Sequence, residues 1–165
     1  MKCCDTTQIF FGGFSYVKMN LEGDRMIPIY VKSVYSYLNS LITIDDLISL
    51  AMEKNWKNLC LCDDNMHGVM EFIRKCEKHA INPIVGVDYH GFLLYAKNYQ
   101  GYQNLLYLEK VRNNHEITIN DLKYISDDLI CLIDCQNKNI DEFKHVFKDI
   151  YVYSSDKKNL QYSYL

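Results

Sequence analysis

Short apolar runs alternate with stretches of helical periodicity along most of the chain, and this alternation limits the fold more than any other feature. Strands are expected in six apolar runs of four to six residues, at residues 27–32, 59–62, 83–87, 92–96, 129–133 and 150–153. Helices are expected where apolar residues recur at helical spacing, at residues 44–54, 67–79, 101–111, 118–122 and 140–147. This order of elements is typical of an α/β protein.

The expected strands show little alternation of polar and apolar residues, which favours burial on both faces, as in a parallel sheet. A closed barrel of strand-helix units usually takes about 200–250 residues. Residues 26–165 number 140, so an open sheet and a barrel cut short both fit this length. Periodicity alone leaves the two architectures open.

The first 25 residues differ from the rest of the chain. Met1 to Arg25 combines glycines and polar residues with scattered aromatics and has weak periodicity. The regular pattern begins at Met26, which we take as the natural start, with residues 1–25 as an N-terminal extension upstream of it. Residues 26–165 then form one domain, which is incomplete.

Composition excludes several classes of protein. Apolar residues make up 48% of the chain, enough for a buried core, and the net charge of −3 provides no strongly basic surface for a phosphate backbone. No apolar run reaches the roughly 20 residues that span a bilayer. The seven cysteines include no Cys-x-x-Cys pair, so we expect reduced thiols and a cytoplasmic protein without a zinc site.

Four blocks of sequence resemble one known family. Residues 30–40, YVKSVYSYLNS, are similar to the opening motif H-x-H-S-x-Y-S-x-L-D/N of polymerase PHP domains. Residues 59–68, LCLCDDNMHG, followed by Glu71-Phe72, resemble the family's A-L-A-T-D-H-G-N-M-x-G…E-F segment, one residue shorter. Residues 80–89, AINPIVGVDY, resemble G-I-x-P-I-I-G-x-E-x-Y, and residues 94–105 resemble L-L-A-K-N…G-Y-x-N-L.

The chain is thus identified as a member of the PHP (polymerase and histidinol phosphatase) family, with a pattern nearest to alpha subunits of DNA polymerase III from low-GC Gram-positive and mycoplasma-like bacteria. The resemblance implies an α/β fold, a distorted (β/α)7 barrel that is partial and truncated here. It also implies a role in DNA replication, inside a parent that is a DNA-directed DNA polymerase, a nucleotidyltransferase. The implied partner is the remainder of the alpha subunit, with replisome proteins and DNA reached only through that parent and no membrane involved.

An intact family member binds a cluster of metal ions through histidines and carboxylates, and this sequence departs from that pattern. The family's ligand positions fall on Tyr30, Lys32, Asn39, Asp63, Asp64 and Asp88. Only Asp63 keeps the family residue. The next histidine position falls on Gly91, with His90 one residue early, and in a strand such an offset would turn the side chain to the opposite face. The resemblance therefore implies a degenerate metal site, with no catalytic residue and no cofactor in this chain.

Two interpretations of the three remaining carboxylates stay open. Asp63, Asp64 and Asp88 are suited to a residual Mg²⁺ or Mn²⁺ site, because hard cations prefer oxygen ligands. Alternatively they pair with Lys32 and cap helix starts, and the ammonium then replaces the positive charge of the metal. The second interpretation is favoured, because it also accounts for the lysine.

The corresponding functions differ in class. The favoured function is structural support for the polymerase, without metal chemistry or catalysis in this part of the chain. The alternative is a small metal-dependent phosphoesterase of the PHP superfamily, which needs most of the missing ligands. A third hypothesis is a free-standing binding module that uses the cleft of the barrel.

Overall fold

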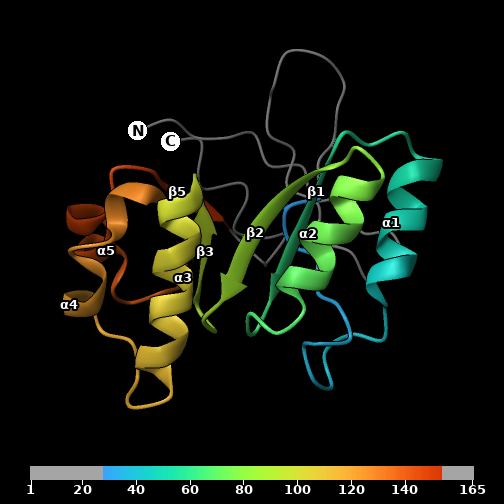
Figure 1. Ribbon diagram of the computed structural model, residues 1–165. Helices are drawn as coiled ribbons and strands as arrows, with labels where there is room; N and C mark the ends of the chain where they lie inside the picture. The colour runs from blue at the N-terminus through green and yellow to red at the C-terminus, as the bar shows by residue number, and fades with distance from the viewer. Residues whose placement is uncertain (1–27, 154–165) are drawn as a thin grey trace. The chain divides into compact units, whose positions relative to one another are not determined.

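The computed structural model of the protein describes residues 28–153, which divide into two compact units, 28–88 and 89–153 (Figure 1). Both units combine helices and strands, so the expected α/β class is confirmed. The expected boundary between residues 25 and 26 lies outside the described residues. None of the helices between residues 28 and 153 is both long and apolar enough to cross a bilayer.

The first unit is built on a pair of parallel strands. Its elements are α1 (Ile44–Glu53), β1 (Asn58–Asp63), α2 (Val69–Lys78) and β2 (Asn82–Asp88). Asp63, at the end of β1, lies opposite Val87 of β2. Because parallel strands end at the same edge of a sheet, Asp63, Asp64 and Asp88 all come to one edge of this pair.

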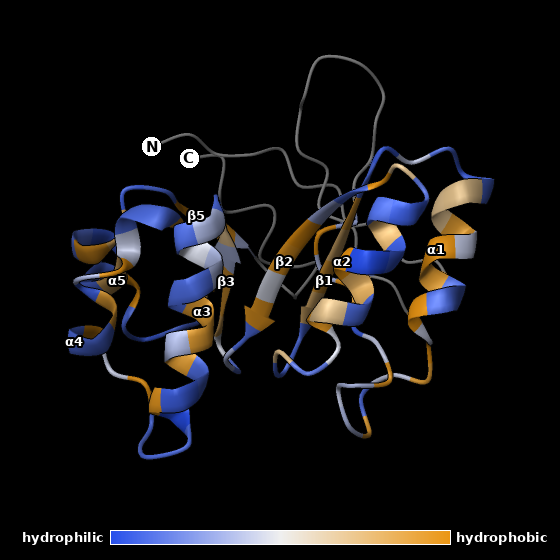
Figure 2. Cartoon of the chain, viewed as in Figure 1, coloured by the Kyte–Doolittle hydropathy of each residue, from blue (hydrophilic) through white to orange (hydrophobic). Residues whose placement is uncertain are grey.

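Local signals in the sequence account for the helices of this unit. Thr43 caps α1, since its Oγ1 accepts a hydrogen bond from the backbone N–H of Asp46 and the Asp46 carboxylate accepts one from the Thr43 N–H. The helix α2 begins at Val69, two residues later than expected, and packs against β1 and β2 (Figure 1). Figure 2 shows the consequence: both strands are mainly hydrophobic, and α2 is hydrophilic on its outer side.

The strand expected at residues 27–32 is wrong in extent, because only Tyr30 forms a bridge among the described residues 28–32. Pro28 has no backbone N–H to add to a ladder. The segment still lies along β1, where the Val31 carbonyl accepts a hydrogen bond from the Cys62 N–H at 2.8 Å and the Cys60 thiol donates to the Ile29 carbonyl at 3.1 Å. These two hydrogen bonds place the residues that follow the segment at the edge where β1 ends.

The second unit has a mixed sheet. Its elements are β3 (Phe92–Ala96), α3 (Tyr99–Arg112), α4 (Ile119–Leu122), η1 (Ser126–Asp128), β4 (Leu129–Asp134), α5 (Ile140–Val146) and β5 (Ile150–Tyr153). β4 and β5 are parallel, but β3 and β4 are antiparallel, so the expectation of parallel pairing is wrong for β3. Leu93, Leu94 and Tyr95 are all buried, and an antiparallel strand without a solvent face shows no alternation in its sequence.

The helix α3 packs closely on the turn that leads into β4. Asn98 caps it by accepting a hydrogen bond from the Gly101 N–H at 2.9 Å, and the helix begins at Tyr99, two residues before the expected start. A Cβ atom at Gly101 would lie 2.2 Å from the Asp128 carbonyl oxygen and 3.1 Å from the Cα of Ala96. Backbone atoms at such distances leave room only for glycine.

The substitution Gly101→Ala should therefore lower the free energy of unfolding by about 2–3 kcal/mol, because backbone and helix have to separate to admit the methyl group. Urea denaturation followed by circular dichroism measures this change. Gln103→Ala, at an exposed position of the same helix, is the control and should change stability by less than about 0.5 kcal/mol. Equal stabilities of the two variants would contradict the close contact.

Candidate functional site

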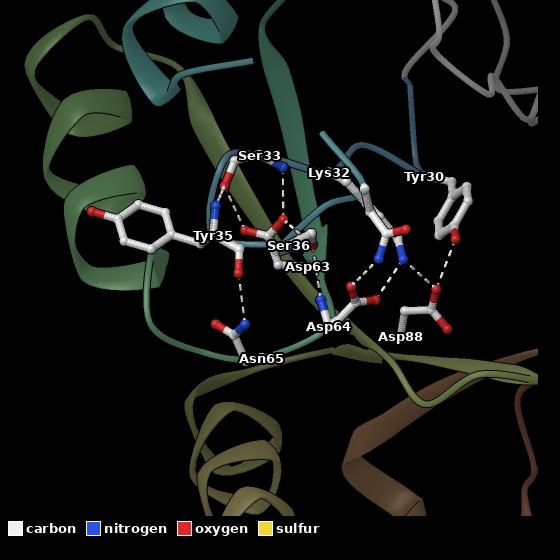
Figure 3. A network of polar contacts seen from close by, with 10 residues as sticks. Tyr30, Lys32, Ser33, Tyr35, Ser36, Asp63, Asp64, Asn65 and Asp88 are labelled. Carbon is white, nitrogen blue, oxygen red and sulfur yellow. Dashed lines mark hydrogen bonds and ion pairs between the residues drawn. The ribbon is translucent and has the colours of Figure 1, made fainter. Parts of the chain in front are cut away.

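A cation and two carboxylates meet at the edge where β1 and β2 end. The ammonium nitrogen Nζ of Lys32 lies 2.5 Å from Asp64 Oδ1 and 2.9 Å from Asp88 Oδ2 (Figure 3). The side chains are 15%, 15% and 7% exposed, so this ion-pair triad is screened from solvent. Of the three carboxylates that the favoured interpretation pairs with Lys32, Asp64 and Asp88 form ion pairs with it.

Two further hydrogen-bond donors face the same carboxylates. The Tyr30 hydroxyl donates to Asp88 Oδ2 at 2.7 Å, and the Asn39 amide Nδ2 donates to Asp64 Oδ2 at 2.8 Å. The Lys32 ammonium also lies 5.5 Å from the centre of the Tyr30 ring, a cation–π distance. These five residues, Tyr30, Lys32, Asn39, Asp64 and Asp88, are called the Lys32 cluster below.

Folding raises the pKa of two members of the Lys32 cluster, Lys32 and Tyr30. Burial by itself would lower the pKa of Lys32, but hydrogen bonds to Asp64 and Asp88 outweigh it and the net pKa is raised. Burial, followed by the hydrogen bond to Asp88, raises the pKa of Tyr30. The ammonium is therefore charged and the phenol neutral. Because the Lys32 pKa is raised on folding, its stabilising contribution is complete below the unfolded pKa and is lost only as pH rises through the folded pKa.

Asp63 plays a different part from its two neighbours. It is 1% exposed, and its carboxylate accepts hydrogen bonds from the Ser33 N–H at 2.6 Å, the Ser33 hydroxyl at 2.7 Å and the Ser36 hydroxyl at 2.7 Å. The Ser36 Oγ in turn accepts from the Asp64 N–H at 3.1 Å. The expectation that all three carboxylates share one site is wrong for Asp63, because it anchors the turn at residues 33–36 to the end of β1.

Sequence reasoning assigned no role to Ser33 and Ser36, although both belong to the first motif. Their hydroxyls are the groups that satisfy the buried carboxylate of Asp63, which would otherwise be costly to hold away from water. The signal was a pair of small hydroxyl residues, three apart, within a block that also holds ligand positions. Which carboxylate the two serine hydroxyls bind depends on contacts between residues that are 27 and 30 positions apart in the sequence.

A second polar cluster ties the same turn to both helices of the unit. The Tyr35 hydroxyl donates to Glu71 Oε2 at 2.6 Å, and the Lys75 ammonium lies 2.6 Å from Glu71 Oε1 and 2.7 Å from Asp45 Oδ1. The Tyr35 ring lies over Gly68, where a Cβ atom would come within 2.4 Å of Tyr35 Cδ2. Tyr35, Gly68 and Glu71, which all match the family's sequence blocks, thus position the turn.

Three of the six ligand positions do not fit a metal cluster. Lone-pair donors are required of metal ligands, but Tyr30, Lys32 and Asn39 each direct a proton at a carboxylate. An ammonium also stands at the point where the oxygens of Asp64 and Asp88 converge. A cation that is covalently part of the chain thus lies between two residues at the ligand positions that the resemblance implies.

The residues around the missing histidine position lie in a bend. His90 has a φ of 54° and Gly91 a φ of 143°, and both precede β3. The expectation that His90 lies in a strand, with its side chain on the face opposite to that of position 91, is wrong, because the chain turns at this point. Positive φ at two successive residues is typical of a tight turn.

The buried thiols provide no nucleophile. Cys60, Cys62, Cys76 and Cys131 are buried and reduced. Burial raises the pKa of Cys76 and of Cys131 to about 12, so both stay protonated at neutral pH. These thiols act as small apolar side chains of the core.

Comparison with known proteins gives one consistent result. Residues 29–161 match the family described as PHP domain. The chain is 36% identical over 139 residues to DNA polymerase III subunit alpha of Ureaplasma parvum, which covers 81% of this chain and 13% of that protein. It is 33% identical over 138 residues to the protein of the same name in Borreliella burgdorferi (67% of this chain, 12% of that protein) and 34% identical over 97 residues to that of Bacillus subtilis (52% and 9%). The chain therefore spans about an eighth or less of the length of these relatives.

The substitution Ser36→Ala should lower the free energy of unfolding by about 2–3 kcal/mol, since it removes one hydrogen bond to the buried Asp63 carboxylate and leaves the Asp64 N–H without this acceptor. Ser49→Ala, at an exposed position of α1, is the matched control. Urea denaturation of both variants measures the difference. A loss below about 0.5 kcal/mol for Ser36→Ala would show that the serine is dispensable.

The substitution Glu71→Gln should produce a stability loss that depends on pH. Hydrogen bonds from Lys75 and then from Tyr35 lower the pKa of Glu71 in the folded protein. A lowered pKa stabilises the fold above the unfolded pKa, and this contribution disappears as pH falls through the folded pKa. The difference in urea midpoint between the parent chain and Glu71→Gln should thus be largest above about pH 5 and shrink towards pH 3. A difference that stays constant over this range would contradict the assignment.

Proposed function

The chain belongs to the PHP domain family, and from this premise we propose that residues 26–165 are part of the PHP region of a DNA polymerase III alpha subunit, with a role in DNA replication. The three relatives described above all carry that name, and they match this chain over a small part of their own length. The polymerase reaction, a nucleotidyl transfer, then belongs to other parts of the parent protein. The proposed location is the cytoplasm, where replication takes place in bacteria.

The proposed role of this region is structural support for the polymerase, without metal chemistry of its own. The observation that carries this proposal is the Lys32 ammonium, which lies 2.5 and 2.9 Å from Asp64 and Asp88. Metal-dependent hydrolysis needs a bound cation that activates water and polarises the phosphoester. An ammonium cannot coordinate a water molecule or a phosphoester oxygen, so it can neither activate the water nor polarise the phosphoester as a metal ion does.

The clusters at the strand ends support a structural role directly. One turn, residues 33–36, is tied to β1 through Asp63 and to α2 through Tyr35 and Glu71. A region stiffened in this way presents a fixed surface to neighbouring parts of a large protein, since little conformational entropy remains to be lost on contact. The proposed partner is the remainder of the alpha subunit, and replisome proteins and DNA are reached only through it.

We further propose that the two units belong to a distorted (β/α)7 barrel of the PHP type, of which the chain supplies a part. Parallel pairing of β1 with β2 and of β4 with β5 supports this architecture. In sequence, α2 lies between β1 and β2, and α5 lies between β4 and β5, as in a strand-helix-strand unit.

Co-expression tests the structural role. The 165-residue chain should co-purify with the part of a relative's alpha subunit that follows the PHP region, for example that of Ureaplasma parvum, and its melting temperature should rise in the complex. Ser36→Ala should weaken this association by loosening the turn, whereas Ser49→Ala should leave it intact. Absence of any complex under conditions where the chain is folded would contradict the proposal.

A phosphoesterase assay tests the absence of metal chemistry. With p-nitrophenyl phosphate and added Mn²⁺ or Zn²⁺, the chain should show no turnover above that of an Asp88→Asn variant. Turnover that is lost in Asp88→Asn would instead establish the metal-dependent phosphoesterase.

A further inference from the structure

The Lys32 cluster contains two carboxylates that share one cation. Asp64 directly follows β1, and Asp88 ends β2. Oxygen atoms of the two side chains lie within 4.8 Å of each other. Two negative charges at this separation repel each other strongly when they are screened from water, so the arrangement requires positive charge between them.

The ammonium is held at one position by three independent contacts. Ion pairs to Asp64 and Asp88 act from two sides, and the face of the Tyr30 ring lies 5.5 Å away. The backbone beside it is fixed, because the Val31 carbonyl accepts a hydrogen bond from Cys62 of β1. The charged nitrogen thus marks the point at which this edge of the unit binds a cation.

We propose that Lys32 occupies and closes a latent divalent-cation site formed by Asp64 and Asp88, and that a neutral residue at position 32 turns these carboxylates into a Mn²⁺ site. The proposal rests on the proposed function, in which the chain has no resident metal at this edge. It adds that the loss of metal is an exchange of one cation for another, made by a single side chain.

The donor set determines the cation that would enter. Two carboxylates, with water completing the shell, suit a hard ion such as Mn²⁺ or Mg²⁺. Two carboxylates by themselves hold such an ion weakly, so a dissociation constant on the order of 10⁻⁴ to 10⁻³ M is expected for them.

The test is Mn²⁺ binding by Lys32→Ala in the 165-residue chain. The loss of the free-ion signal in electron paramagnetic resonance measures binding, and thermal melts with and without about 10 mM MnCl₂ measure stabilisation. The variant should melt at a lower temperature than the parent without metal and gain about 3–5 °C with Mn²⁺. The parent chain should bind no Mn²⁺ at this edge and show no such gain.

Two variants show where the ion binds. Lys75→Ala is the matched control, since Lys75 also lies between two carboxylates, at 2.6 and 2.7 Å, but its partner Asp45 is 75% exposed. Solvated carboxylates repel each other little, so this variant should gain no Mn²⁺ binding. The double variant Lys32→Ala with Asp88→Asn should lose the binding that the single variant gains.

Two results would overturn the proposal: a folded Lys32→Ala protein that binds no Mn²⁺, or a parent chain that binds Mn²⁺ equally well and loses it in Asp88→Asn. Lys32→Gln, which keeps a side chain of moderate length, is a second route to the same measurement. If neither variant folds at any Mn²⁺ concentration, a free cation does not replace the ammonium and the proposal is wrong. Association with the polymerase is measured in a separate experiment. If the chain does not associate but Lys32→Ala gains Mn²⁺ binding, the proposed function is rejected and this inference stands.

Discussion

Repulsion between two carboxylates is the constraint on which the edge of the first unit depends. The parallel pairing of β1 and β2 brings Asp64 and Asp88 together at 15% and 7% exposure, and the cation between them offsets the repulsion of the two carboxylates. Lys32 provides that cation from a segment that lies along β1. The position of this segment, and therefore of the turn that follows it, is coupled to the charge at the strand ends.

A fixed lysine differs from a metal ion in its physical consequences. An ion is lost when its concentration falls, whereas an ammonium on the chain is present in every folded molecule. A buried ion pair contributes little net stability against an apolar replacement, but removal of one partner leaves a buried charge and is strongly destabilising. The cluster therefore makes the arrangement of residues 28–88 dependent on Lys32.

Several residues that match the family pattern hold the scaffold of the first unit together. Tyr35, Gly68 and Glu71 match the family pattern, and they pack and hydrogen-bond the turn at residues 33–36 onto α2. Asp63 also keeps the family residue, and here it accepts three hydrogen bonds from two serines. A residue at a position of the metal motif thus also contributes to folding.

Local chemistry in the sequence determined the α/β class, most helix and strand positions, and the loss of the ligands. The Thr43 cap acts over three residues, and opposite charge was sufficient to pair Lys32 with aspartates. Tertiary structure alone decided that Asp63 binds serines and that β3 runs antiparallel to β4. Those outcomes depend on contacts between residues some 30 or more positions apart, whose geometry is set by how the strands pair and not by the neighbours of each residue along the chain.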